Sequence, residues 1–506
     1  MDSRDGELYT GDGASRQSQR RVWIRRRLWH TLDSDSMSIV IGGGGICGLG
    51  TALLLARSGH DVTLLERDPS PPPASPDEAW ERWERKGVTQ FRQPHNFMPG
   101  MRLLLEAELP DVQDALVDTR PSRFDLVNPL PPTFTDRAPR PIDDKLWTFT
   151  VRRPVGEWAF AAVAAREPRL TIRRGVTITE LLTGSSAIAG VPHVSGVRTS
   201  DGEVLAAELV VDATGRASRS PDWLSAIGAR APYEEQEDCG FTYYTRYFSG
   251  TVPERRGPAL FPVGSMSLLT LPGDSNTWSV TVFIATGDQA LKNLRHDDRW
   301  MNVVRACPLH AHWLDGEPTT PVMAMSGIAD RYRRFVVDGT PVATGFVAVA
   351  DAWACTNPSA GRGLTVGMLH GVQLRDTVRA HADDPRALVE EFHRRTDRDI
   401  APWYHAQIAV DRTRFAEMEA IREGRERPAP ATELGRQIVG LMTSLGADPD
   451  LFRAGLEYAG TVTPVQQILQ RPDVIERLAV VREKMKNLPR PPALGPSREQ
   501  LLQIVA

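Results

Sequence analysis

The glycine-rich stretch at residues 39–52 constrains the fold of this chain more than any other part of its sequence. It begins with the apolar run Ile39–Ile41, passes through four consecutive glycines and continues into a helix-like apolar segment. Gly43, Gly45 and Gly48 occupy the frame G-x-G-x-x-G. In this frame the glycines allow a tight turn, a close approach of the backbone to a phosphate, and close packing of helix on strand. The helix N-terminus then offers free N–H groups to an anion. The stretch therefore predicts a strand, a turn and a helix that bind a dinucleotide.

A second apolar strand is predicted at residues 61–65, and it ends at Glu66. In dinucleotide-binding folds an acidic residue about 20 positions after the glycines accepts a hydrogen bond from a ribose hydroxyl. Glu66 stands at that place, so we expect it to bind the ribose.

Two later segments also read as an apolar strand followed by a polar turn. Residues 209–219 end in Asp-Ala-Thr-Gly-Arg-Ala-Ser-Arg. Residues 345–352 include Asp351 near the strand end, and the chain then runs through Pro358 to Gly-Arg-Gly at residues 361–363.

Together with the N-terminal loop, these segments resemble in order and spacing the three fingerprints of FAD-dependent monooxygenases of the para-hydroxybenzoate hydroxylase fold. A closer likeness is to squalene-epoxidase-like and polyether-epoxidase-like flavoenzymes, which share the middle fingerprint and a stretch similar to residues 85–95. The resemblance covers roughly residues 38–411. It implies an α/β protein in which a Rossmann-like FAD-binding domain is interleaved with an antiparallel-sheet substrate domain, with a helical region at the C-terminus.

The resemblance also implies which residues bind non-covalent FAD. Asp351 would accept hydrogen bonds from the ribityl chain, and the helix that starts near Gly363 would present N–H groups to the isoalloxazine ring. Relatives usually have glycine where this chain has Ala350. A simple helix-capping role for Asp351, and solvent exposure of Arg153, are the alternatives. The expected cofactor-binding residues are Gly43, Gly45, Gly48, Glu66, Arg92, Arg153, Asp351, Gly361 and Gly363.

Three residues are candidates for contact with the substrate. His95 and its neighbour Arg92 belong to the stretch that resembles the family, and a surface position is the alternative for His95. Tyr243 and Tyr247 alternate on one face of a strand predicted within residues 241–248. One face of that strand should line the substrate cavity, and ordinary packing is the alternative for both tyrosines.

The function implied by the resemblance is monooxygenation. Reduced FAD would react with O2 to give a C4a-hydroperoxide, which would hydroxylate or epoxidise an apolar or aromatic small molecule, as in specialised metabolism. The sequence has no second G-x-G-x-x-G motif. NAD(P)H would therefore dock transiently, or a separate flavin reductase would deliver the electrons. This reaction does not require a particular acid or base from the protein, so the sequence predicts no catalytic acid–base residue. An FAD-dependent dehydrogenase or prenyl reductase of the same fold, and a non-enzymatic flavin-binding protein, remain alternatives.

Composition excludes several other classes of protein. The 506-residue chain has a net charge of −4 and a pI near 6.3, which predict no general attraction to nucleic acid. No apolar run reaches the 18 residues of a membrane-spanning helix. Four scattered cysteines and no metal-ligand spacing indicate a reduced, cytoplasmic protein without a metal site.

The order of motifs predicts seven segments. Residues 1–36 carry a basic run at 20–29 but no secretory signal, and they read as a disordered extension, with a surface-binding amphipathic helix as the alternative. The FAD-binding domain is expected at 37–110, 151–230 and 336–385, the substrate domain at 111–150 and 231–335, and the helical C-terminal region at 386–506.

Overall fold

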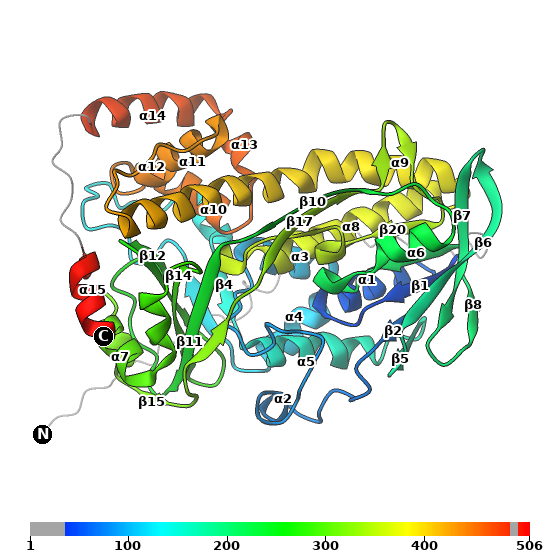
Figure 1. Ribbon diagram of the computed structural model, residues 1–506, viewed down its shortest axis with the longest axis horizontal. Coiled ribbons are helices and arrows are strands. Elements are labelled where there is room, and N and C mark those ends of the chain that lie inside the picture. The colour runs from blue at the N-terminus through cyan, green and yellow to red at the C-terminus, as the bar shows by residue number, and fades with distance from the viewer. Residues whose placement is uncertain (1–35, 486–493) are drawn as a thin grey trace, which may run out of the picture. The chain divides into compact units, whose positions relative to one another are not determined.

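The computed structural model describes residues 36–485 and 494–506, and Met37–Ala506 form one compact unit. Apart from Ser36, the predicted N-terminal extension lies outside the described residues. The first sheet of this unit is five-stranded and parallel (Figure 1). Its strand order is β20 (Phe346–Ala348), β9 (Leu209–Asp212), β1 (Ser38–Gly42), β2 (Asp61–Glu66) and β5 (Leu170–Arg174).

Both faces of the parallel sheet are covered, which explains why β1 is a continuous apolar run rather than an alternating one. Ile39 and Ile41 pack into a core with the helices α1 (Ile46–Ala56), α5 (Arg153–Ala164) and α8 (Gly363–His381). Val40 faces the opposite side and packs with residues of a small antiparallel sheet. That sheet contains β6 (Ile178–Ile188), β7 (Val191–Thr199) and β8 (Val204–Ala206).

The second large sheet has β11 (Phe241–Ser249) near its centre. It has the order β12 (Leu260–Val263), β13 (Met266–Pro272), β14 (Thr277–Ala285), β11 and β15 (Glu317–Pro318), and β16 (Met323–Met325) also pairs with β11. All of these pairs are antiparallel. Tyr244 and Phe248 pack on one face against α7 (Asp297–Arg305) and α15 (Arg498–Val505). Because side chains alternate along a strand, Tyr243 and Tyr247 point to the other face.

Long segments run between the two sheets (Figure 1). They are the strands β10 (Tyr233–Asp238) and β17 (Ala329–Arg334), which pair with each other, and the helix α10 (Ala401–Arg422). The short strand β21 (Ala354–Cys355) pairs with β17. The segment between β20 and α8 therefore lies beside the strands that lead to the antiparallel sheet.

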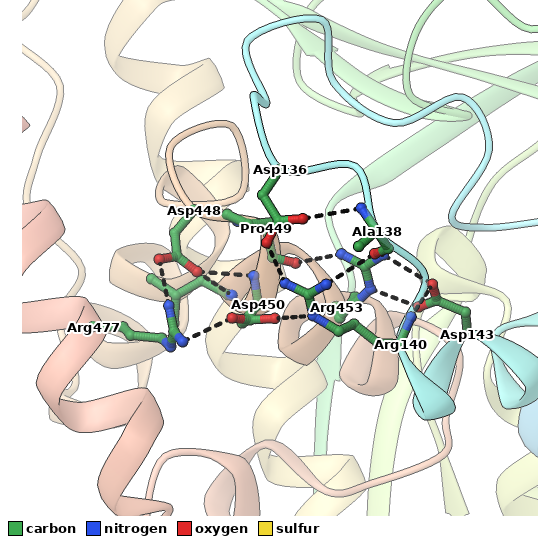
Figure 2. Close-up of polar contacts among 10 residues, drawn as sticks. Asp136, Ala138, Arg140, Asp143, Asp448, Pro449, Asp450, Arg453 and Arg477 are labelled. Atoms are coloured by element: carbon green, nitrogen blue, oxygen red, sulfur yellow. Dashed lines mark hydrogen bonds and ion pairs between the residues drawn. The ribbon is translucent and has the colours of Figure 1, made fainter.

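A group of C-terminal helices surrounds a core of its own, to which Trp403 of α10 also contributes. These helices are α11 (Glu433–Thr443), α12 (Pro449–Ala459), α13 (Val465–Ile468) and α14 (Pro472–Met485). Figure 2 shows how ion pairs join them to residues 136–143. Arg453 of α12 is buried, and its Nε lies 2.6 Å from Oδ1 of Asp143. Arg477 of α14 bridges Asp448 and Asp450 at 3.0 and 2.8 Å.

Further helices and strands connect these parts. They are α2 (Pro76–Glu81), β3 (Ser122–Asp125), β4 (Trp147–Thr150), α3 (Pro99–Glu108), α4 (Pro110–Val117), α6 (Ser220–Ala226), β18 (Val336–Val337), β19 (Thr340–Pro341) and α9 (Pro385–Arg395). The parallel sheet, the antiparallel sheet and the helical C-terminal region confirm the predicted fold class. Among the described residues, no helix is both long and apolar enough to cross a membrane.

Candidate functional site

One cavity of about 470 Å³ collects most of the predicted site residues. It begins at the loop between β1 and α1 and passes the end of β2, the start of α5 and the turn after β9. It then continues along the segment from Ala350 to Gly363 and reaches the side of α10. Residues that are more than 300 positions apart in the sequence therefore face one space.

The glycine loop forms one part of the wall of this cavity. Gly43 has φ +105°, a conformation that favours glycine, and a Cβ there would lie 2.3 Å from the carbonyl oxygen of Ala213. A Cβ on Gly48 would lie 1.9 Å from the carbonyl oxygen of Gly43, so helix and strand pack without room for a side chain. Around Gly45, by contrast, there is open space. Gly45 is also the N-cap of α1, where the free N–H groups can meet an anion.

A chain of alternating buried charges lies next to this loop. Oε2 of Glu66 accepts the N–H of Gly44 at 2.7 Å and lies 2.5 Å from Nη2 of Arg85. Nη1 of Arg85 lies 2.5 Å from Glu157, whose other oxygen pairs with Arg153 at 2.7 Å. Burial alone would raise the pKa of Glu157, but the charges of Arg153 and Arg85 outweigh it and hold the pKa below its ordinary value. The network fixes a carboxylate of β2 and an arginine of α5 at the wall of the cavity.

The third fingerprint forms another part of the wall. β20 ends at Ala348, and a 3₁₀ turn over Ala350–Ala352 brings Asp351 to the cavity. Burial raises the pKa of Asp351, while the charges of Arg153 and Arg216 oppose this effect. Ala350 has φ +52°, which explains why relatives of the resembled family favour glycine there.

The start of α8 completes this part of the wall. Gly361 has φ +67° and precedes Arg362, the N-cap of the helix. A Cβ on Gly363 would meet open space. The first N–H groups of α8 are thus accessible from the cavity, like those of α1.

His95 also lines the cavity, as the sequence suggests. Its Nδ1 lies 2.9 Å from the carbonyl oxygen of Gln93. Burial and the nearby charge of Arg153 lower the pKa of His95 to about 3, so this imidazole is neutral at physiological pH.

Three predicted residues lie elsewhere. Arg92 does not line the cavity, and its guanidinium donates to the backbone carbonyls of Trp80 and Trp83. The hydroxyl of Tyr243 donates to Oδ1 of Asn357, which does line the cavity, so Tyr243 stands behind that residue. Tyr247 is buried, with its ring 4.9 Å from that of Trp80.

The structure adds residues that sequence reasoning did not select. Arg85 lies only seven positions before Arg92 in the stretch that carries the family resemblance, and of these two arginines it is Arg85 that lines the cavity. Asn357 precedes the proline of the third fingerprint, and its Nδ2 donates to Asp411 of α10 at 3.0 Å. Trp403 and Gln407 of α10 form part of the wall, and no motif in the sequence marked them.

Asp411 sits behind the wall without a basic partner among the described residues. It accepts hydrogen bonds from Asn357, from Ser359 at 3.2 Å and from Gln407 at 2.8 Å. Burial raises the pKa of Asp411 to about 7, with a further contribution from Asp330.

The residues present fit FAD. The cavity has a carboxylate, Glu66, that could accept hydrogen bonds from a ribose, open space at Gly45 for a pyrophosphate, and a second helix N-terminus at Gly363 for the flavin ring. A side chain at Gly45 would project into the cavity. Glycine at this position therefore leaves open space next to the backbone, which a cofactor can fill.

Comparisons with known proteins agree with this arrangement. Residues 38–80 match the model of a family described as FAD dependent oxidoreductase. The chain is 26% identical over 378 residues to Protein Rv3254 of Mycobacterium tuberculosis, covering 72% of this chain and 77% of that protein. Among solved structures it is similar to PqsL, a probable FAD-dependent monooxygenase from Pseudomonas aeruginosa, with 16% identity, a TM-score of 0.54, and 76% and 99% of the two chains covered.

A second solved structure of this kind is OxyS, the anhydrotetracycline hydroxylase from Streptomyces rimosus. It shares 16% identity with this chain at a TM-score of 0.53, with 84% of this chain and 76% of that chain covered. The fold and the match at the glycine loop define the class of protein. The chain has the fold of FAD-dependent oxidoreductases, and monooxygenases of the para-hydroxybenzoate hydroxylase fold are among its structural neighbours, which confirms the resemblance seen in the sequence.

Proposed function

We propose that this protein is an FAD-dependent monooxygenase that hydroxylates or epoxidises an apolar or aromatic small molecule in specialised metabolism. The supporting observation is that one cavity is lined both by expected cofactor residues and by apolar residues, and we call the part lined by the apolar residues its apolar compartment. Gly45, Asp351 and Gly363 line it together with the apolar residues Met325, Ile328, Trp403 and Val366. A substrate in the apolar compartment would lie against the ring end of the cofactor.

The bound FAD would supply the redox chemistry with O2, and the chain would supply binding, orientation and exclusion of water. Glu66 would accept the ribose hydroxyls, and the N-termini of α1 and α8 would donate to the pyrophosphate and the flavin ring. The imidazole of His95 is neutral at physiological pH because its pKa is about 3. It would therefore contribute a neutral polar side chain to the cavity wall and would not act as a general acid.

The electron donor in this proposal is NAD(P)H docking transiently, or a separate flavin reductase. The proposal is tested on purified protein in two steps. Denaturation should release FAD, with no colour left on the polypeptide. The protein reduced anaerobically by dithionite, NADH or NADPH is then mixed with O2 in a stopped-flow spectrometer.

A monooxygenase should show a transient absorbance change that precedes rapid return of the oxidised flavin spectrum. Slow reoxidation without the transient would favour the FAD-dependent dehydrogenase or prenyl reductase. Protein without flavin, or with a flavin that neither donor nor dithionite reduces, would favour a non-enzymatic protein.

A further inference from the structure

Arg362 is a cation in the cavity wall that has no acidic partner in the described part of the chain. It is the N-cap of α8 and lines the cavity. Its Nη1 donates to Oε1 of Gln407 at 3.0 Å and to the hydroxyl of Tyr458 at 2.8 Å. Both acceptors are neutral, so the positive charge of Arg362 is held in place but not neutralised.

The position of this guanidinium is set by residues that are themselves fixed. Its Cζ lies 3.8 Å from the centre of the Tyr458 ring, an arrangement that stabilises a cation over an aromatic face. The ring of Trp403 stacks on the same tyrosine, with 6.2 Å between the centroids. Gln407 is held by Asp411 and by Ser359. The guanidinium is therefore preorganised beside an aromatic, apolar surface.

The donors that remain define the ligand. Nε of Arg362 is enclosed and has no acceptor, and Nη2 makes no hydrogen bond within residues 36–485 and 494–506. Because Nε is enclosed, a ligand cannot reach it, so Nη2 is the donor of this guanidinium that a molecule in the cavity can use. A cationic N–H donor makes a strong, charge-assisted hydrogen bond to a carboxylate oxygen.

We propose that Arg362 binds the carboxylate of the substrate, so that the substrate class is an apolar or aromatic carboxylic acid rather than a neutral hydrocarbon. This inference rests on the proposed function. The carboxylate would accept a hydrogen bond from Nη2, and the apolar body would lie along Trp403 and Val366, which line the same cavity.

The test uses the FAD-loaded protein and two matched pairs of probes, namely 2-naphthoate with 2-naphthamide and octanoate with octanamide. Each probe is titrated while the change in the flavin absorbance spectrum is recorded. At least one carboxylate should bind roughly 10-fold or more tightly than its amide, the ratio expected for charge-assisted hydrogen bonds.

Variants locate the effect at Arg362. Arg362→Gln should remove the preference for the carboxylate and leave amide binding within about 2-fold, whereas Arg362→Lys should keep part of the preference because it keeps the charge. Arg398→Gln is the matched control, since Arg398 is exposed, pairs with Asp399 and lies outside the cavity lining. It should behave like the parent protein.

Three outcomes would overturn the inference. They are equal binding of acids and amides by the parent protein, absence of binding by both acids, and loss of FAD from Arg362→Gln, which would place the arginine on the cofactor. A parent protein that prefers the carboxylates but shows no oxygen-dependent transient would instead refute the monooxygenase proposal and leave carboxylate binding intact.

Discussion

Arg85 and Glu66 form a buried ion pair with 2.5 Å between Nη2 and Oε2. The same carboxylate oxygen accepts the N–H of Gly44, and the same guanidinium pairs with Glu157. Glu66 is therefore positioned before any cofactor arrives. Preorganisation of this kind lowers the free-energy cost of binding, because the site does not have to be ordered by its ligand.

Replacement of Glu66 by alanine should weaken FAD binding by roughly 1.5–3 kcal/mol, the range for a hydrogen bond to a charged group. Glu66→Gln should lose less, since it keeps one acceptor oxygen. The dissociation constant is measured by adding FAD back to the apoprotein. Glu106→Ala removes an exposed carboxylate outside the cavity and serves as control. An unchanged dissociation constant in Glu66→Ala would remove Glu66 from the ribose site.

Ala350 adopts a left-handed conformation, with φ +52°, that costs an L-residue about 1 kcal/mol. Ala350→Gly should therefore raise the free energy of unfolding by about 0.5–1 kcal/mol. Ala387 lies in the ordinary helix α9, where the same substitution should lower stability by about 1 kcal/mol. Both variants are compared with the parent by urea unfolding. Equal losses in the two would show that the backbone at Ala350 is not strained.

The local parts of the site could be predicted from the sequence. The glycine loop, the strand ending at Glu66 and the strand–turn around Asp351 are short segments whose residues dictate their own conformation. The structure finds each of them where the pattern predicts it, with φ +105° at Gly43 as the clearest sign.

Long-range contacts could not be predicted in this way. Arg85 is held at the cavity partly by Glu157, 72 positions away, and no spacing rule links them. Alternation showed that Tyr243 and Tyr247 share a face of β11 but not what covers that face. Asn357 intervenes between Tyr243 and the cavity. The wall formed by α10 depends on how that helix docks, which only tertiary packing decides.

The ion pairs of Figure 2 should decide how firmly the C-terminal helices are attached. Arg453 is buried between Asp143, the carbonyl of Ala138 and its own helix. Arg453→Ala should lower the free energy of unfolding by about 3–5 kcal/mol, because it leaves the Asp143 carboxylate without its partner. Arg140→Ala removes the more exposed pair with Asp450 and should have a much smaller effect. Denaturant unfolding checks both, and equal effects would contradict the difference in burial.

Asp411 should make stability depend on pH. Its pKa is raised from 3.8 to about 7 in the folded protein, so the folded state binds this proton more tightly than the unfolded state does. Stability should therefore fall as the pH rises from about 4 to 7, and the loss should be complete above 7. Asp330, Tyr243 and Cys239 are the ionisable groups that interact with it.

The variant Asp411→Asn stays neutral at every pH. The free energy of unfolding of this variant, relative to the parent, should therefore rise by about 1–3 kcal/mol between pH 5 and pH 8. Denaturant unfolding of both proteins at pH 5 and pH 8 measures this difference in the free energy of unfolding. Asp383→Asn, at an exposed position, should show a constant difference. A constant difference in Asp411→Asn as well would mean that Asp411 is ionised throughout this range.

Asp351→Ala should abolish flavin retention or reduce turnover without unfolding the chain. Asp351 lines the cavity within the turn that follows β20, where the charges of Arg153 and Arg216 act on its carboxylate. Without a group to hold the ribityl chain, the flavin ring would no longer be fixed against the apolar compartment, and displacements of about 1 Å can cost 10²-fold in rate. FAD content, circular dichroism and the rate of substrate-dependent O2 consumption are measured together. Asp376→Ala, on the exposed part of α8, is the control. Normal FAD content and an unchanged rate in Asp351→Ala would reduce the third fingerprint to a capped turn, and the assignment would then depend on the first two fingerprints.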